Sequence, residues 1–186
     1  MSKGINTLII ASGSIGILQL PQYINWLKYN GYSCKCVMTK SAADLLPPTT
    51  VSTMVDTYTD NGSWGSFARV PHIALGDWAK LVLVIPASAN IISKVAHGIC
   101  DNLATTTIMA TEAPVYFFPN MGQSMFNKKV IQNNMDLLVQ MGYYVYSEKS
   151  EGFSIGRSRY EYSITLPTIG QFEKIMQEHT YSIERG

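Results

Sequence analysis

The sequence predicts an α/β fold: a single domain with a parallel sheet that is covered by helices on both faces. The apolar run Leu81–Ile85 is too short for a helix and rich in β-branched residues, as in a buried strand. Apolar residues at helical spacing follow it, from Ile91 to Ile99. The same order of strand, small-residue turn and helix occurs at 7–27, and a chain of 186 residues is long enough for one domain with its own core.

The junction after Leu81–Ile85 predicts a ligand site. Pro86 is expected to end the strand, and the small residues Ala87, Ser88 and Ala89 let the backbone approach a ligand closely. In an open parallel sheet, ligands bind at the carboxyl ends of the strands, where the free N–H groups of a helix start attract anions.

Two further strand ends are predicted at the same edge of the sheet. The strand Thr7–Ala11 leads into the turn Ser12–Gly16, whose glycines and hydroxyl groups could hold a phosphate or form an ordinary helix cap. The strand Tyr32–Met38 leads into a short helix from Thr39. Thr39 and Ser41 could likewise contact a phosphate, and Ser41 could instead cap the helix.

The rest of the chain is predicted to alternate between strands and helices, with one long loop. The loop, 47–69, has little periodicity and contains Trp64 and Phe67. Strands are expected at Thr106–Ala110, Val115–Phe118 and Tyr143–Tyr146, and helices at Asn127–Met141 and Thr168–His179, followed by a frayed tail at 181–186.

Composition excludes several functions. The formal net charge of +1, with acidic and basic residues mixed, gives no electrostatic footprint for nucleic acid or a membrane surface. No signal peptide or membrane-spanning segment is expected. Cys34, Cys36 and Cys100 form no disulfide framework, which favours a reduced, cytoplasmic setting. Cys34 and Cys36 would share one strand face, and because a metal site needs more ligands, core packing is expected and a metal is not.

PASAN at 86–90, followed by KVAHGICDNL at 94–103, resembles the signature of the homo-oligomeric flavin-containing cysteine decarboxylases. The similarity is greatest to the lantibiotic-type peptidyl-cysteine decarboxylases, which act on the C-terminal Cys of a precursor peptide. The resemblance implies a Rossmann-like or flavodoxin-like three-layer sandwich over residues 1–186, FMN as cofactor, and a homotrimer that can assemble further into a homododecamer.

The resemblance also implies roles for particular residues. Gly13 and Ser14 would hold the phosphate arm of FMN, and Ser88 and Asn90 its ring or ribityl chain. The expected cofactor-binding residues are Gly13, Ser14, Ile15, Thr39, Ser41, Pro86, Ala87, Ser88, Asn90 and Asp101. A lone His near an apolar run is more often structural, but the family carries its active-site His a short distance before the PASAN strand, which makes His72 the expected catalytic residue; His97 and His179 lack this placement.

A second segment resembles the substrate-contacting motif of the family, Pro-x-Met-Asn-x-x-Met-Trp. Pro119, Met121 and Met125 match it, whereas Gly122 stands where Asn is usual and Phe126 where Trp is usual. Either Asn120 or Gln123 replaces the missing amide, or turnover is weakened. Residues 151–167 resemble the clamp that closes over the peptide, with Gly152 and Gly156 as hinge points. The expected substrate-binding residues are Asn120, Met121, Gly122, Met125, Ile164 and Thr165.

The function implied is FMN-dependent oxidative decarboxylation of a peptide's C-terminal Cys. Removal of a hydride from Cβ gives a thioaldehyde, and loss of the carboxylate then gives an enethiol for aminovinyl-cysteine formation. His72 would serve as acid or base or would orient the cysteine. Decarboxylases of phosphopantothenoylcysteine carry a reducing Cys downstream, but no Cys follows Cys100 here. The alternatives are such a coenzyme A pathway enzyme, a related prenyltransferase, or a non-catalytic flavin-binding regulatory subunit.

Overall fold

The computed structural model describes residues 4–60, 70–154 and 159–183. In this part of the chain, six strands form a sheet in the order β3-β2-β1-β4-β5-β7. They are β1 (Asn6–Ala11), β2 (Ser33–Met38), β3 (Asp56–Thr59), β4 (Leu81–Ala87), β5 (Val115–Pro119) and β7 (Tyr144–Val145). Every neighbouring pair is parallel. The strand order reverses between β1 and β4, as in Rossmann-type sheets.

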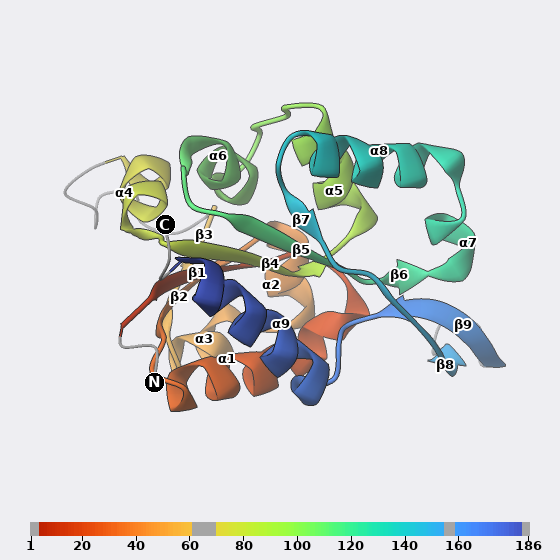
Figure 1. The fold of residues 1–186 in the computed structure, drawn as a ribbon, viewed down its shortest axis with the longest axis horizontal. Helices are drawn as coiled ribbons and strands as arrows, with labels where there is room; N and C mark the ends of the chain where they lie inside the picture. Colours follow the sequence, from red (N-terminus) through yellow and green to blue (C-terminus); the bar gives the residue numbers. More distant parts are fainter. Residues whose placement is uncertain (1–3, 61–69, 155–158, 184–186) are drawn as a thin grey trace.

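Helices cover both faces of this sheet (Figure 1). One face carries α1 (Leu20–Tyr29), α3 (Pro48–Ser52) and α9 (Ile169–Ile183). The other carries α4 (Pro71–Trp78), α5 (Ala89–Ala96), α6 (Leu103–Ala110) and α8 (Lys129–Gln140). The short helices η1 (Ile15–Gln19) and α2 (Lys40–Leu45) follow β1 and β2. The predicted three-layer α/β sandwich is therefore confirmed.

Alternating residues of the strands build two cores, one on each side of the sheet. In β1, Leu8 and Ile10 pack with β4, α5, α6 and α8, whereas Ile9 and Ala11 pack with α1 and α9. All four are fully buried. Because both faces of this parallel sheet are covered, the central strand β4 is apolar at every position, as the run Leu81–Ile85 indicated.

A small antiparallel sheet lies beside the main one (Figure 1). It consists of β6 (Met121–Gly122), β9 (Arg159–Thr165) and β8 (Glu148–Ser154), with β9 in the middle. The short helix α7 (Gln123–Phe126) follows β6. The segment expected to be a clamp is thus a hairpin of β8 and β9, docked through Met121 against Ile164 and Gly122 against Ser163. Gly152 lies within β8, and Gly156 lies outside the described residues.

The strand predicted at Thr106–Ala110 is wrong, since these residues belong to α6. Asn102 caps this helix by accepting from the Thr105 N–H at 2.9 Å. The Thr107 hydroxyl donates to the Leu103 carbonyl one turn earlier, at 2.7 Å, so a buried β-branched residue is satisfied within the helix. The cap and the packing of α6 on α4 outweigh the strand preference of the threonines.

The predicted loop at 47–69 also needs correction, because it contains α3 and β3. Val51 of α3 is fully buried, and β3 pairs along β2 from Lys35–Asp56 to Met38–Thr59. Elements this short do not show a period in the sequence. Trp64 and Phe67 lie outside the described residues.

Several boundaries differ from the predicted ones. Pro86 lies inside β4, which ends at Ala87, and α5 ends at Ala96, so that Ile99 is exposed. The C-terminal helix α9 extends through Tyr181 to Ile183.

Cys34 and Cys36 pack against the same core cluster, as expected. Burial raises the pKa of the Cys34 thiol to about 12. No group of three metal-ligating side chains occurs among the residues that the structure describes, and none of the described helices is long and apolar enough to cross a membrane.

Candidate functional site

A cavity of about 490 Å³ opens where the first four strands end. It lies at the reversal point of the sheet, which is where ligands bind in folds of this type. The structure brings together there seven residues that the sequence predicted: Gly13, Thr39, Ser41, Ser88, Asn90, Asp101 and Met125.

Ser12 joins the two turns that form the floor of the cavity. Its hydroxyl donates to the Pro86 carbonyl at 2.7 Å and accepts from the Ser88 N–H at 2.8 Å. The Ser12 N–H also donates to Pro86, at 3.2 Å. Ser12 is buried, so these bonds fix the end of β1 against the end of β4.

Gly13 is required by a close approach. A Cβ at this position would lie 2.4 Å from the Cβ of Ser41 and 3.2 Å from the Ser41 carbonyl carbon. The turn after β1 and the start of α2 therefore meet backbone to backbone, leaving a concave surface that an added side chain would push apart.

Three helices begin at the cavity, and each has a side-chain cap. Thr39 accepts from the Ala42 N–H at 3.3 Å, Ser88 from the Ile91 N–H at 3.4 Å, and Asn102 from the Thr105 N–H at 2.9 Å. The cap of α2 is therefore Thr39, not Ser41. Each cap satisfies one N–H of its helix start, and the first N–H groups of α2 and α5 remain for an anion, whereas the Leu103 N–H at the start of α6 is taken by Asp60.

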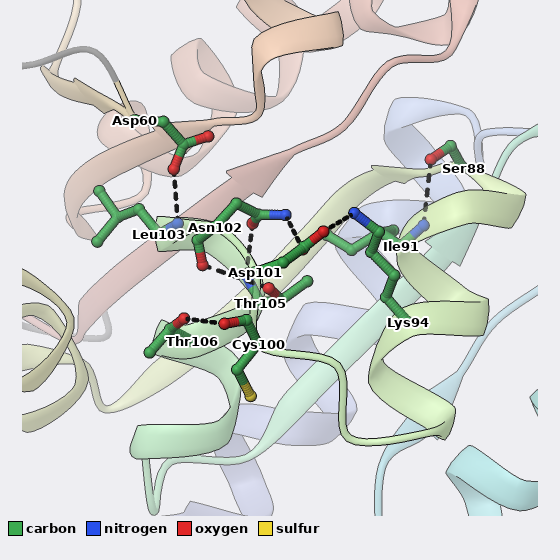
Figure 2. A network of polar contacts seen from close by, with 10 residues as sticks. All are labelled: Asp60, Ser88, Ile91, Lys94, Cys100, Asp101, Asn102, Leu103, Thr105 and Thr106. Carbon is green, nitrogen blue, oxygen red and sulfur yellow. Dashed lines mark hydrogen bonds and ion pairs between the residues drawn. The ribbon is translucent and has the colours of Figure 1, made fainter.

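A charged network closes the side of the cavity between α5 and α6 (Figure 2). Lys94 reaches from α5 to the Asp101 carboxylate at 2.6 Å, and Asn102 donates to the same carboxylate at 2.8 Å. The hydrogen bond from Lys94 is the main cause that lowers the pKa of Asp101. Asp60, at the end of β3, accepts from the Leu103 N–H at 2.6 Å and so joins β3 to the start of α6.

Four cavity residues were not predicted: Lys40, Asp60, Lys94 and Asn102. Ser12 and Ala89 also line the cavity and belong to the two turns that were predicted to approach a ligand. Lys94 stands four residues after Asn90, on the same face of α5, and this spacing is a signal that could have found it. Asp60 was missed because β3 was missed.

Asn120 connects the turn after β1 to the hairpin. Its Oδ1 accepts from the Ser14 hydroxyl and, at 3.0 Å, from the Gly16 N–H. Its Nδ2 donates to the Ile164 carbonyl at 3.0 Å. Ser14 also donates to the Asn120 carbonyl at 2.9 Å. The amide therefore fastens η1, the end of β5 and β9 together.

The remaining predicted site residues lie outside the cavity lining. Pro86 and Ala87 are buried in β4, and the Ala87 carbonyl accepts from the Asn120 N–H at 3.0 Å. Ile15 is exposed on η1. Ser14, predicted to hold the phosphate arm, does not line the cavity, and its hydroxyl donates to Asn120 instead. The others lie on or beside the small sheet: Asn120, Met121, Gly122, Ile164 and Thr165.

His72, the predicted catalytic residue, is also absent from the lining of the cavity. It is half-buried in the first turn of α4, which packs against α6. Its neighbours Val70 and Ile73 are apolar and are 48% and 40% exposed. His97, at the end of α5, is exposed and contacts the Ser93 carbonyl through Nδ1 at 2.9 Å.

The cavity suits a flavin with a phosphate arm. Its volume lies within the range of about 300–1,000 Å³ that is usual for cofactor sites. The donors for phosphate and ribityl oxygens are the first N–H groups of α5, the hydroxyl groups of Ser41 and Ser88, and the Lys94 ammonium. The close approach at Gly13 gives the backbone surface that such an arm needs.

Comparisons with known proteins show the family to which the chain belongs. The model of the Flavoprotein family matches residues 1–167. Mersacidin decarboxylase of Bacillus sp. (strain HIL-Y85/54728) is 38% identical over 139 residues, which is 74% of this chain and 71% of that protein. The bifunctional coenzyme A biosynthesis protein CoaBC of Bacillus subtilis (strain 168) is 35% identical over 84% of this chain, but the chain spans only 40% of its length.

Solved structures show the same fold. The FMN-dependent cysteine decarboxylase SpaF superposes with a TM-score of 0.81 and 28% identity over 96% of both chains. An EpiD variant in complex with the substrate peptide DSYTC superposes with a TM-score of 0.80 and 30% identity, over 90% of this chain and 95% of that one. The chain therefore belongs to the Flavoprotein family, which confirms the expected flavin cofactor, and it is a relative of the FMN-dependent cysteine decarboxylases.

Proposed function

We propose that this protein is an FMN-dependent decarboxylase that oxidatively decarboxylates the C-terminal Cys of a precursor peptide to an enethiol. One observation carries the proposal: the cavity at the end of the main sheet and the β8–β9 hairpin are joined through Asn120. A hairpin beside a cofactor cavity is suited to hold an extended peptide, and relatives with this activity include mersacidin decarboxylase and EpiD.

In this proposal the residues of the chain bind and orient the cofactor and the peptide. FMN, when bound, would accept a hydride from the cysteine Cβ, and the oxidised cysteine would then serve as the electron sink for loss of CO2. Gly13, Ser41 and the start of α5 would hold the phosphate and ribityl arm. Met125 lines the cavity from the side of the small sheet and would separate the reacting Cys from water.

His72 would complete the site of a neighbouring subunit in a homotrimer. The supporting observations are that His72 is not among the residues that line the cavity and that the apolar residues Val70 and Ile73 beside it are exposed. Ile15 and Leu18, on η1 next to the cavity, are also more than half exposed and would be covered in the same assembly. His72 would then orient the cysteine or transfer its proton.

A second candidate is decarboxylation of phosphopantothenoylcysteine, because CoaBC is also a relative. That reaction ends with reduction of the enethiol by a Cys, and the last Cys of this chain is Cys100, an exposed residue between α5 and α6. The segment where the reducing Cys would stand reads Ser154 to Ser158. This favours the oxidative reaction on a peptide.

The test is to incubate the purified yellow protein in air with synthetic peptides that end in Cys and to follow their mass. A loss of about 46 mass units, about 44 for CO2 and about 2 for two hydrogens, is expected. His72→Asn should abolish this loss while FMN stays bound. Bound FMN without any change in peptide mass would contradict the proposal and favour a regulatory flavoprotein.

A further inference from the structure

In the segment that resembles the substrate-contacting motif, Gly122 stands where Asn is usual. The backbone at this position does not require glycine. Gly122 precedes α7 with φ −64° and ψ 148°, which any residue adopts. A Cβ built there would meet nothing within 4 Å. The position therefore leaves open space at the point where β6 meets β9.

Asn120 is not free to fill the role of the missing amide. Its Oδ1 already accepts from Ser14 and Gly16, and its Nδ2 donates to the Ile164 carbonyl. Turning this amide toward a substrate would break three contacts that fasten η1 to the hairpin.

Gln123, the next residue after Gly122, carries an amide oxygen that is buried and, among the described residues, has no hydrogen-bond partner. Buried polar atoms are almost always paired, so an unpaired one marks a position where a partner is missing. Gln123 lies on α7 together with Met125, which lines the cofactor cavity, and α7 contacts β9 of the hairpin.

We propose that Gln123 positions the substrate by accepting a hydrogen bond, through Oε1, from the backbone N–H of the peptide's C-terminal Cys. This inference rests on the proposed function and assigns one specific contact within it. The open space at Gly122 leaves room for the peptide backbone beside α7. Because the Gln123 oxygen is enclosed in the free chain and Gln123 does not line the cavity, its side chain would turn toward this space when the peptide binds.

The test measures binding of two peptides to the His72→Asn protein, which removes turnover. One peptide ends in Cys, and the other is identical but ends in N-methylcysteine, which lacks the N–H. We expect N-methylation to weaken binding about tenfold, the effect of losing one hydrogen bond to a buried acceptor. In a protein that also carries Gln123→Ala, both peptides should bind with equal, weak affinity. Gln140→Ala, at an exposed position of α8, is the matched control and should retain the tenfold difference.

Two further measurements separate positioning from structure. Because Gln123→Ala removes an unpaired buried oxygen, the urea midpoint and the FMN content should not fall. Adding Gly122→Asn to Gln123→Ala should restore part of the lost affinity, since the space at Gly122 admits the side chain.

The inference is overturned if the protein with Gln123→Ala binds the Cys peptide as tightly as the protein that retains Gln123. It is also overturned if N-methylation still weakens binding tenfold in that variant. A different result, in which the protein with Gln123 binds no Cys-terminated peptide at all, overturns the proposed function, and this inference falls with it.

Discussion

At Gly13, the absence of one carbon atom decides whether two turns can meet. The Cβ of an alanine would overlap the Cβ of Ser41 at 2.4 Å, and the nearby Ser41 backbone at 3.2 Å leaves little room to relax. The surface that would cradle the phosphate arm therefore exists only with glycine at this position.

We expect Gly13→Ala to lower the free energy of unfolding by about 1–3 kcal/mol, as other overpacked sites do, and to empty the protein of FMN. Urea titration and the flavin absorbance per protein measure the two effects. Gly170→Ala is the matched control, because a Cβ there meets nothing within 4 Å and its φ is not positive. Retention of FMN by Gly13→Ala would show that the turn does not bind it.

Asn120 is the second residue on which the site depends. Asn120→Ala would leave the Gly16 N–H and the Ile164 carbonyl without their partner, so we expect a loss of about 2 kcal/mol in stability. Hydrogen exchange should rise in η1 and β9 together, because one amide joins them. Asn133→Ala, on the exposed face of α8, should change neither quantity. Faster exchange in only one of the two elements would contradict the proposed link.

Site residues could be predicted where their role depends on neighbouring residues in the sequence, and less well where it depends on contacts with distant residues. Ser88 could be found because a short apolar strand, a run of small residues and a helix follow one another directly, and Asn90 because PASAN resembles a family motif. The spacing of Lys94 from Asn90 could have indicated its position, but its ion pair with Asp101 could not be predicted. The hydrogen bond from Ser12 to Pro86 joins residues 74 positions apart, and no local pattern indicates such a bond. The structure was also needed to show that the Asn120 amide is used in hydrogen bonds within the fold, whereas the Gln123 oxygen is not.

At the scale of elements, α1 is fastened to the C-terminal part of the chain by Tyr23. Its hydroxyl donates to the Pro167 carbonyl at 2.6 Å, and its ring lies edge-on to Phe172 of α9 with centroids 5.0 Å apart. Burial raises the pKa of Tyr23 from 10.0 to about 12. Between these values the unfolded chain loses the proton and the folded chain keeps it, so stability must fall as pH rises.

We therefore expect the free energy of unfolding to decrease between pH 10 and pH 12, with Tyr23 contributing roughly 2–3 kcal/mol of the decrease. Tyr23→Phe should cost about 1 kcal/mol at pH 7 and show a shallower alkaline decrease. Urea titrations of both proteins across this range give the comparison. Parallel curves for the two would mean that Tyr23 ionises equally in both states.

Elements with long periodic patterns were predictable, and short or competing ones were not. The buried strands β1 and β4 follow from their apolar runs, whereas β3 has four residues, all at least partly exposed. The threonines of α6 favour a strand by themselves, and only the Asn102 cap and the contact with α4 decide for a helix.

At the scale of the whole molecule, the composite site is proposed because His72 does not line the cavity of its own chain. Mixing two inactive proteins tests it: His72→Asn keeps the cavity and lacks the His, whereas Gly13→Ala keeps the His and lacks the cavity. If each site takes the two parts from different subunits, co-expression should restore activity at about a quarter of the sites. Activity that stays absent in isolated mixed oligomers would place both parts in one chain.

The measurement that tests the central claim most directly is a reaction without oxygen, in which peptide ending in Cys is mixed in excess with the yellow protein and its absorbance, the released CO2 and the peptide mass are followed. An oxidative decarboxylase that stops at the enethiol leaves two electrons on the flavin per peptide. We predict one CO2 per flavin, bleaching of the yellow colour, and a peptide about 46 mass units lighter, with turnover resuming when air is admitted. Continued CO2 release without bleaching, and a product only about 44 mass units lighter, would contradict the account and assign the chain to the redox-neutral decarboxylases.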